Sequence, residues 1–336
     1  MLKESLAKLI RGEDLSEAEM IRSTSAIMEG EATLAQIGSF LTGLRLKGET
    51  VAEITGAARV MREKSLKIRF DAPVVIDTCG TGGDGANTFN ISTTVAFIVA
   101  AAGVPVAKHG NRAMSSRCGS ADLLEALGIK IDLPPQRIEQ CLKEIGIGFL
   151  FAPAFHQAMK HVIGPRRELG FRTVFNLLGP LTNPAGANCQ LIGIYDPGLT
   201  ETVAQVLKRL GVRRAMVVHG GGGLDELSLE GENKVTFLEN DEIKSFILKA
   251  SDLGLEEAAN RTLAGENPAT NAALTESILR GTETGPRRSV VLLNAGAALK
   301  VAGVVSDLRE GVALAGRLID EGAAYARLNS LRAIAS

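Results

Sequence analysis

Apolar residues follow a helical period over the first part of the chain. Four of them recur at intervals of three and four positions, at Leu34, Ile37, Leu41 and Leu44. This spacing predicts an amphipathic helix, and Gly48 stands where such a helix would end. Ser16 and Thr50 each precede a glutamate by three positions, which is the spacing of a capping box at a helix start. We therefore expect residues 1 to about 68 to be helical.

Beyond Pro73 the pattern changes to short apolar runs that alternate with helical segments. The runs that predict strands cover residues 74–76, 104–107, 147–151, 191–194 and 215–218. The segments that predict helices between them cover residues 93–102, 121–127 and 201–210. Strands that alternate with helices favour a mostly parallel central sheet covered on both faces, so the expected fold class is α/β.

A different pattern closes the chain. Residues 234–238 and 242–248 flank Asn240-Asp241, which predicts a β-hairpin. Helical spacing then returns in residues 271–279, 290–302 and 308–321. The sequence therefore predicts a hairpin after the parallel strands, followed by helices.

Composition limits the partners of this protein. The chain has 336 residues, enough for two domains, and 45% of them are hydrophobic. Lys and Arg number 37 against 38 Asp and Glu, for a formal net charge of -1. A balanced chain has no overall attraction for nucleic acid or for an anionic membrane, so any anion site must be local.

Cysteine spacing and the apolar runs favour a cytoplasmic protein. The start of the chain lacks the apolar core of a signal peptide. The most apolar run, residues 95–107, is too short to span a bilayer and contains Gly103 and Pro105. No Cys-x-x-Cys occurs among the four scattered cysteines, so neither a zinc site nor a disulfide framework is indicated.

A glycine-rich loop follows the first predicted strand. Residues 77–85 read Asp-Thr-Cys-Gly-Thr-Gly-Gly-Asp-Gly, and the next helix opens with the hydroxyls of Ser92, Thr93 and Thr94. Glycines let backbone N–H groups approach a ligand closely, and a helix N-terminus adds unpaired donors with a positive partial charge. The loop therefore predicts an anion cradle. It is neither a Walker A motif nor a Rossmann fingerprint, because the required spacings are absent.

The second predicted strand leads into a polar run. Residues 108–120 read Lys-His-Gly-Asn-Arg-Ala-Met-Ser-Ser-Arg-Cys-Gly-Ser and combine three cations, an amide, three hydroxyls and a histidine. A single cation would be a solvated surface charge, whereas this density of phosphate-binding groups indicates a site. Ligands of open α/β sheets gather beyond the carboxyl ends of the strands, so we expect both loops at one pocket.

Two adjacent acids, Asp225 and Glu226, follow the last predicted parallel strand and a run of glycines. Mg²⁺ binds carboxylates while it keeps several waters and bridges to substrate phosphates. The pair therefore predicts a magnesium site, with a solvent-exposed acidic turn as the alternative.

Three arginines, Arg166, Arg167 and Arg172, stand close together earlier in the chain. A guanidinium can grip a carboxylate or a phosphate with two parallel hydrogen bonds. Composition alone does not choose among the three.

Taken together, these segments resemble the anthranilate phosphoribosyltransferase family in order and spacing. The matching segments are residues 80–84, 90–93, 108–120 and 223–226, and Arg166 with residues 175–183. The resemblance spans nearly the whole chain. One departure is Gly222, which stands where an acidic residue is frequent; it would lessen the charge of that loop while the acidic pair remains.

The resemblance implies a fold and a reaction. It implies a small all-helical domain of residues 1–70, rejoined by residues 161–185, and a larger α/β domain of residues 71–336. It also implies a homodimer formed through the helical domain. The reaction would transfer phosphoribose from phosphoribosyl diphosphate to the amine of anthranilate in tryptophan biosynthesis.

The resemblance further implies the site residues. Ser92, Asp225 and Glu226 would carry magnesium, with a pair of Mg²⁺ ions per monomer. Anthranilate would meet Gly80, Asn111 and Arg166, with Arg166 facing its carboxylate. Phosphoribosyl diphosphate would be held by Gly80, Gly83, Asp84, Thr88, Asn90, Ile91, Ser92, Thr93, Lys108, His109, Gly110, Asn111, Arg112, Ala113, Met114, Ser115, Ser116 and Ser120.

The residue set favours catalysis by positioning and electrostatics. No Ser-His-Asp or Cys-His set stands out, and a neutral aromatic amine needs no strong base. The nearest alternative is a pyrimidine nucleoside phosphorylase, a relative with a similar loop and fold; Asn111 and residues 223–226 favour the transferase. A non-catalytic relative that binds nucleic acid is a further alternative, and the balanced charge argues against it.

Overall fold

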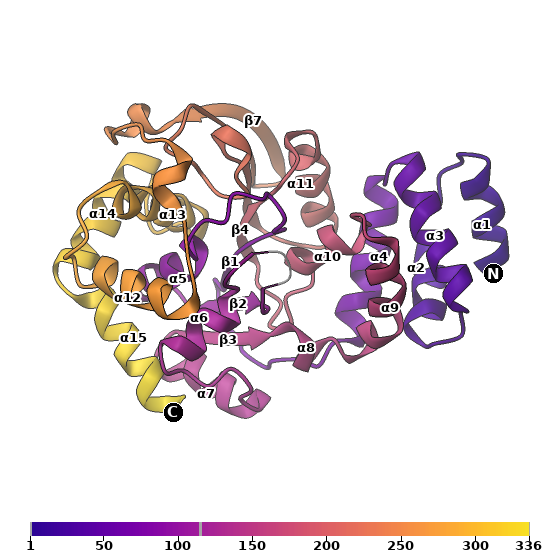
Figure 1. Ribbon diagram of the computed structural model, residues 1–336, viewed down its shortest axis with the longest axis horizontal. Helices are drawn as coiled ribbons and strands as arrows, with labels where there is room; N and C mark the ends of the chain where they lie inside the picture. The colour runs from indigo at the N-terminus through magenta and orange to yellow at the C-terminus, as the bar shows by residue number, and fades with distance from the viewer. Residues whose placement is uncertain (1, 114–115, 336) are drawn as a thin grey trace.

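The computed structural model describes residues 2–113 and 116–335, and its first four helices form a bundle at one end of the molecule (Figure 1). Both predicted capping boxes are confirmed, at Ser16 and at Thr50. Gly48 ends the third helix with a φ of 88°, as predicted. The helices are α1 (Leu2–Ile10), α2 (Glu17–Met28), α3 (Leu34–Lys47) and α4 (Val51–Lys64).

A seven-stranded sheet forms the centre of the rest of the chain, in the order β3-β2-β1-β4-β5-β6-β7. Two antiparallel strands at one edge form the predicted hairpin, with Asn240 and Asp241 at positive φ between them: β6 (Glu232–Glu239) and β7 (Glu242–Lys249). The other strands run parallel: β1 (Ile76–Gly80), β2 (Val106–Gly110), β3 (Ile147–Phe151), β4 (Cys189–Gly193) and β5 (Arg214–His219). Because β2 and β3 lie on one side of β1 and β4 lies on the other, the carboxyl ends of β1 and β4 flank a topological switch point.

The first two strands run further than the sequence predicted. The predicted strands 74–76 and 104–107 are wrong in extent, since the ladders continue through Gly80 and Gly110. Asp77, which the sequence places in the first loop, lies in β1 and is fully buried. Its carboxylate accepts hydrogen bonds from the His109 N–H at 3.2 Å and from the Asn183 side chain at 2.7 Å. These distant partners satisfy a buried charge that a local apolar pattern does not reveal.

Helices cover both faces of the sheet. On one face α5 (Ile91–Ala101) is buried between β1 and α13 (Pro286–Ala302), and both helices share a hydrophobic core with that face. The helices that complete this layer are α6 (Ser120–Ala126), α12 (Pro268–Leu279), α14 (Leu308–Asp320) and α15 (Ala323–Ile334). The sequence did not predict α15, nor α7 (Pro135–Glu144), which packs against β3.

The other face joins the sheet to the helical bundle. Here α10 (Phe175–Leu181) and α11 (Thr200–Arg209) both pack against α4, so one hydrophobic cluster runs from the bundle to the sheet. The short helix α8 (Ala152–Phe155) leads from β3 toward α9 (Lys160–Leu169), which packs against α2 and α3 (Figure 1). Among the described residues, no helix combines the length and hydrophobicity needed to cross a membrane.

Candidate active site at the strand ends

Gly80 and Gly193 pair at the carboxyl ends of β1 and β4, and the turn that carries Asp225 lies directly against them. A Cβ atom on Gly193 would stand 1.5 Å from the Asp225 carbonyl oxygen, and one on Gly80 would stand 2.4 Å from its Oδ2. Both positions require glycine, because only a missing side chain lets the acidic turn approach the strand ends. The first loop and the acidic pair therefore meet at the switch point.

The acidic pair is held by the first loop and by the start of α5. The Asp225 carboxylate accepts a 2.6 Å hydrogen bond from the Gly82 N–H, and Glu226 accepts a 3.2 Å bond from the Ser92 N–H. Asp84 Oδ2 lies 3.4 Å from the backbone nitrogen of Asp225, so a third carboxylate borders the pair. Glu226 is only 9% exposed and Asp225 is half-buried, so the pair is not the solvent-exposed acidic turn that the sequence leaves open.

Burial and mutual repulsion raise the pKa of both acids. Desolvation is the main cause at Asp225, followed by the charge of Asp84. Desolvation also dominates at Glu226, followed by the charge of Asp225. Buried carboxylates that face one another are unfavourable unless a cation compensates them. The arrangement therefore has the electrostatics of a cation site.

The donors around the pair fit magnesium. Within the described residues, no group of three or more His, Cys, Asp or Glu side chains could hold a metal ion by itself. Mg²⁺ does not need such a cage, because one or two carboxylates usually hold it together with waters and substrate phosphates. The Ser92 hydroxyl, 3.4 Å from the Lys108 ammonium, adds an oxygen donor near Glu226. These residues fit an ion that a diphosphate helps to hold.

The first loop is built from glycines at positive φ. Gly82, Gly83 and Gly85 have φ values of 68°, 77° and 76°, which residues with a side chain rarely adopt. Thr88 then pairs with Ala264 in an isolated bridge before α5 begins. The loop thus offers mainly backbone groups to a ligand, as an anion cradle requires.

At the start of α5 the predicted residues divide into two sets. The side chains of Ile91 and Thr93 are 1% and 2% exposed, so only their main chain can face a ligand. Ser92 is half-buried beside Glu226, and Asn90 is half-buried at the N-cap. Of these four side chains, only those of Asn90 and Ser92 are therefore partly exposed.

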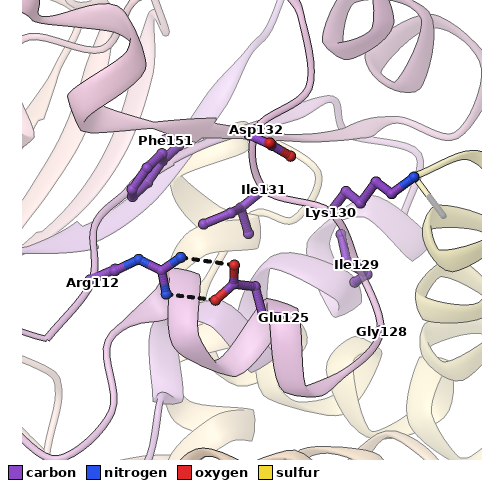
Figure 2. A pocket seen from close by; sticks show the side chains of 8 residues that line it. All are labelled: Arg112, Glu125, Gly128, Ile129, Lys130, Ile131, Asp132 and Phe151. Atoms are coloured by element: carbon purple, nitrogen blue, oxygen red, sulfur yellow. Dashed lines mark hydrogen bonds and ion pairs between the residues drawn. The ribbon is translucent and has the colours of Figure 1, made fainter.

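A hollow of about 450 Å³ lies beside the second loop (Figure 2). It is lined by Arg112, Glu125, Phe151 and residues 128–132. Neither Asp225 nor Glu226 lines it. It is therefore distinct from the switch-point site, although Arg112 belongs to the second loop.

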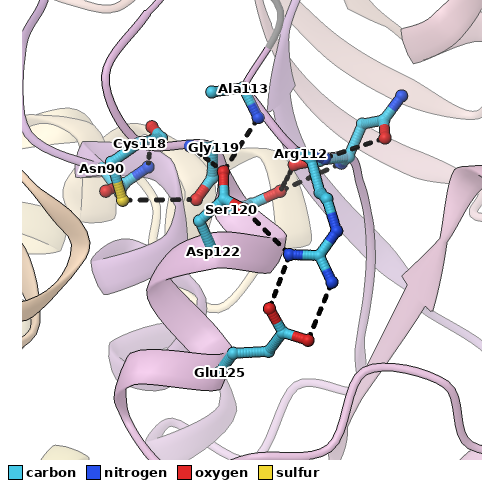
Figure 3. Close-up of polar contacts among 9 residues, drawn as sticks. Asn90, Arg112, Ala113, Cys118, Gly119, Ser120, Asp122 and Glu125 are labelled. Carbon is cyan, nitrogen blue, oxygen red and sulfur yellow. Dashed lines mark hydrogen bonds and ion pairs between the residues drawn. The ribbon is translucent and has the colours of Figure 1, made fainter.

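Side-chain contacts close the base of the second loop. The Ser120 hydroxyl lies 3.2 Å from the Asn111 nitrogen and 3.3 Å from its carbonyl oxygen, which joins the two ends (Figure 3). Position 110 requires glycine, because a Cβ there would stand only 2.1 Å from the Ser120 hydroxyl. The Asn90 side chain donates a 3.0 Å hydrogen bond to the Cys118 carbonyl and so ties the first loop to the second.

The remaining predicted residues of this loop lie in different surroundings. Lys108 is buried, and its ammonium contacts the Thr78 carbonyl as well as the Ser92 hydroxyl. Ser116 is exposed. Met114 and Ser115, also predicted as ligands, lie outside the described residues.

His109 packs against His156, which the sequence did not single out. Their ring centroids are 5.1 Å apart, both are buried, and neither Nε2 has a hydrogen-bond partner in the described part of the chain. Burial lowers the pKa of His109 to about 3 and that of His156 to about 4. Both rings are therefore neutral near pH 7. No local motif marks His156, so only the fold reveals the pair.

The three arginines of the central segment differ in their surroundings. Arg172 contacts the Gly83 carbonyl and lies 4.0 Å from the centroid of the Tyr195 ring. Arg167 is exposed. Arg166 is half-buried, and its guanidinium forms no hydrogen bond or ion pair within residues 2–113 and 116–335. A partly buried, unpaired guanidinium is the best prepared of the three to bind a carboxylate.

Gly222, where the sequence departs from the resemblance, is fixed by packing. Its φ is 73°, and a Cβ on it would stand 2.4 Å from the Asn260 side-chain nitrogen. A side chain at this position would be strained by the positive φ and would require the Asn260 side chain to move, so the glycine belongs with this local arrangement.

Comparison with known proteins gives matches over almost the entire chain. Residues 72–325 match the model of the glycosyl transferase family a/b domain, and residues 3–65 match that of the family's helical bundle domain. The anthranilate phosphoribosyltransferase of Moorella thermoacetica is 58% identical over 98% of this chain and 97% of its own length. That of Desulfosudis oleivorans is 54% identical over 98% of both chains.

Solved structures also match over almost the entire chain. The anthranilate phosphoribosyltransferase of Thermus thermophilus is 46% identical, with a TM-score of 0.94 over 98% of both chains. The Saccharomyces cerevisiae enzyme in complex with PRPP (phosphoribosyl diphosphate) and Mg is 29% identical, with a TM-score of 0.91 over 99% of this chain and 97% of that one.

Proposed function

Since this chain belongs to the anthranilate phosphoribosyltransferase family, we propose that it transfers phosphoribose from 5-phosphoribosyl 1-diphosphate to the amine of anthranilate and releases pyrophosphate. The observation that carries the proposal is the Asp225–Glu226 pair, half-buried at Asp225 and buried at Glu226, which contacts the first loop at Gly82 and the start of α5 at Ser92. A cation site beside an anion cradle is the combination that a departing diphosphate needs.

Phosphoribosyl diphosphate would bind between the two loops at the switch point. The backbone amides of residues 80–85 and 110–113 would meet its phosphate oxygens, together with the helix N-terminus at Ser92. Lys108 would supply a buried positive charge next to them. Support for this placement comes from the positive φ angles of the loop glycines and from the hydrogen bond that ties Asn90 to the second loop.

Magnesium is the cofactor that these residues fit, and we propose a pair of ions per monomer. The donors divide into two groups, Asp225 with Asp84 and Glu226 with Ser92. Bound magnesium would neutralise the diphosphate and make it a better leaving group. In the absence of a cation, the first group leaves two half-buried carboxylates beside each other and the second leaves the buried carboxylate of Glu226.

Anthranilate would bind with its carboxylate on Arg166. This guanidinium is half-buried and unpaired in the described residues, and it lies 5.6 Å from the centroid of the Phe175 ring. Asn111 and Gly80, at the ends of β2 and β1, would form the wall nearest the reacting amine. The protein would thus hold one substrate by its diphosphate and the other by its carboxylate.

The chemical step needs positioning more than proton transfer. The bond between C1 of the ribose and the diphosphate oxygen breaks, and the oxygen keeps the electron pair. The amine lone pair forms the new C1–N bond, and the amine then releases a proton to solvent. Lys108 and the loop amides would stabilise the charge that develops on the leaving group, while Arg166 aligns the nucleophile.

We further propose a homodimer formed through the helical bundle in the cytoplasm. Three large apolar side chains on the surface of the bundle support the interface: Ile10, Leu34 and Leu46 are 84%, 61% and 83% exposed. All four cysteines are free and buried, which suits a reducing compartment.

A fluorescence assay tests the function directly. Anthranilate fluorescence should fall when the protein, phosphoribosyl diphosphate and Mg²⁺ are combined, and it should stay constant when any one is omitted. Thymidine or uridine phosphorolysis in place of this activity would instead identify a nucleoside phosphorylase and overturn the proposal.

A further inference from the structure

The Arg112 side chain is already engaged by two carboxylates on α6. Its Nη1 donates to Asp122 Oδ1 at 3.0 Å and to Glu125 Oε2 at 2.6 Å, and its Nη2 donates to Glu125 Oε1 at 2.8 Å (Figures 2 and 3). The guanidinium also lies 5.8 Å from the centroid of the Phe151 ring. Arg112 is therefore held by a bidentate pair with Glu125 and a third bond to Asp122.

Asp122 also holds both described ends of the second loop. Its Oδ2 accepts hydrogen bonds from the Ala113 N–H and from the Gly119 N–H, each at 2.9 Å (Figure 3). One carboxylate thus joins the Arg112 guanidinium through one oxygen and the loop backbone through the other. The side-chain network and the loop backbone are therefore one connected structure.

Close backbone packing completes this connection. A Cβ on Gly119 would stand 2.4 Å from the Ala113 nitrogen and 2.6 Å from the Asn111 carbonyl oxygen, so the two loop ends touch. Because the ends touch, a change in how Arg112 is held would be transmitted to the backbone amides of both ends.

The charge of the network argues against a phosphate as the partner of Arg112. One guanidinium faces two carboxylates, which leaves the group net negative. A diphosphate that approached this side chain would therefore meet repulsion from Asp122 and Glu125 as well as attraction from Arg112. Lys108, by contrast, has no carboxylate within ion-pair distance in the described residues.

We propose that Arg112, Asp122 and Glu125 form a clasp that holds the two described ends of the second loop, at Ala113 and Gly119, in place before substrate binds, so that Arg112 is a positioning residue and its side chain is not a ligand of the diphosphate. This inference rests on the proposed function, because the loop is taken to bind phosphoribosyl diphosphate. The clasp lowers the ordering cost of binding by fixing the loop amides in advance. Single exposed ion pairs contribute little, but a bidentate pair within a network contributes more.

The two possible roles of Arg112 predict opposite effects of Glu125→Gln. If the clasp orders the loop, loss of the Glu125 charge weakens binding of phosphoribosyl diphosphate by about fivefold. If Arg112 instead leaves Glu125 to bind phosphate, the same change frees it and tightens binding. Titration calorimetry of the full-length protein with phosphoribosyl diphosphate and Mg²⁺ shows whether Glu125→Gln lowers or raises the affinity.

A charge exchange separates the clasp from a general loss of structure. The double variant Arg112→Glu with Glu125→Arg should recover part of the affinity that Arg112→Glu loses, because the pair between positions 112 and 125 is restored in reverse, while the new glutamate faces Asp122 and the third bond is not restored. A double variant as weak as Arg112→Glu alone would overturn the clasp. For the single variants Arg112→Glu and Glu125→Gln, steady-state kinetics should show a raised KM for phosphoribosyl diphosphate, with kcat changed by no more than about twofold.

Two controls make each outcome decisive. Glu242→Gln removes an exposed ion pair with Lys244 on the edge strand β7 and should leave the affinity unchanged. Failure of the unaltered protein to bind phosphoribosyl diphosphate would overturn the proposed function itself. Normal binding by the unaltered protein together with unchanged or tighter binding by Glu125→Gln would overturn only the clasp.

Discussion

The carbonyl oxygen of Asp225 occupies the place that a side chain on Gly193 would fill, 1.5 Å from the position of its Cβ. The last residue of β4 and the acidic turn after β5 are thus fitted to each other at the switch point. The position of the carboxylates therefore depends on a residue that takes no part in the chemistry.

This contact predicts the effect of Gly193→Ala. The added methyl group must push the Asp225 turn away from β4, which costs about 1–3 kcal/mol of stability and displaces the carboxylates. We expect turnover to fall by more than about a hundredfold, since even an error of about 1 Å in a catalytic group costs that much. Thermal unfolding and the anthranilate assay measure the two effects.

Gly38→Ala in α3 is the matched control. A Cβ on Gly38 has no neighbour within 4 Å, and the residue lies in a helix interior where alanine is favoured. Stability should rise by up to about 1 kcal/mol with turnover unchanged. Normal turnover in Gly193→Ala would show that the acidic turn does not need its present position.

Neutral replacements of the acidic pair should separate stability from activity. Asp225→Asn with Glu226→Gln keeps the shape of both side chains and removes one half-buried and one buried carboxyl group that form no ion pair in the described residues. The free energy of unfolding without Mg²⁺ should stay the same or rise. Turnover should fall by about a hundredfold or more, because the site loses its hold on magnesium. Turnover at the parental rate under limiting Mg²⁺ would refute the metal role of the pair.

Replacement of Arg166 should affect one substrate only. Arg166→Gln removes a guanidinium that forms no hydrogen bond or ion pair in the described residues and lies 5.6 Å from the centroid of the Phe175 ring, so stability should change by less than about 1 kcal/mol. The KM for anthranilate should rise by about tenfold or more, as expected for loss of a charge-assisted bidentate contact. The exposed neighbour Arg167 provides the control, and Arg167→Gln should match the unaltered protein. An unchanged anthranilate KM in Arg166→Gln would exclude the carboxylate contact.

The sequence predicted best those elements whose apolar or turn-forming residues indicate directly whether they are buried or exposed. The ladder of β3 begins and ends where the apolar run of residues 147–151 does, and the hairpin turns at Asn240-Asp241. The ends of β1 and β2 escaped prediction because Asp77 and Lys108 are polar and yet buried. Their partners, Asn183 and Thr78, lie 106 and 30 positions away along the chain.

Contacts between residues far apart along the chain, or between side chains whose pairing no motif marks, also explain what the sequence missed in the site. The spacing of the loops indicated where phosphate-binding groups gather, but it did not show that Asp122 and Glu125 occupy the Arg112 side chain. Three neighbouring arginines have the same chemistry, and only their surroundings distinguish Arg166. His156 carries no local signal at all, since its meaning comes from its contact with His109.

The buried histidine pair makes stability depend on pH. The pKa of His109 is lowered to about 3 and that of His156 to about 4, with burial as the main cause; His156 and then Lys108 lower the pKa of His109 further, and Lys67 lowers that of His156. In the unfolded chain both groups have a pKa near 6.5. Above that pH neither state binds a proton, so the full stability is present. As the pH falls from about 6.5 toward 4, the unfolded chain takes up two protons that the folded protein does not, and stability is lost.

Replacement of His156 isolates this effect from the carboxylates that titrate in the same range. With His156→Gln, only His109 remains, so the slope of unfolding free energy against pH between about 4.5 and 6 should decrease by about 1.4 kcal/mol per pH unit. At about pH 8, where neither histidine is protonated in either state, the slopes of the variant and the unaltered protein should coincide. Urea unfolding at a series of pH values gives both slopes. Equal slopes below about pH 6 would mean that His156 takes up its proton in the folded protein, and hence that the pair is open to water.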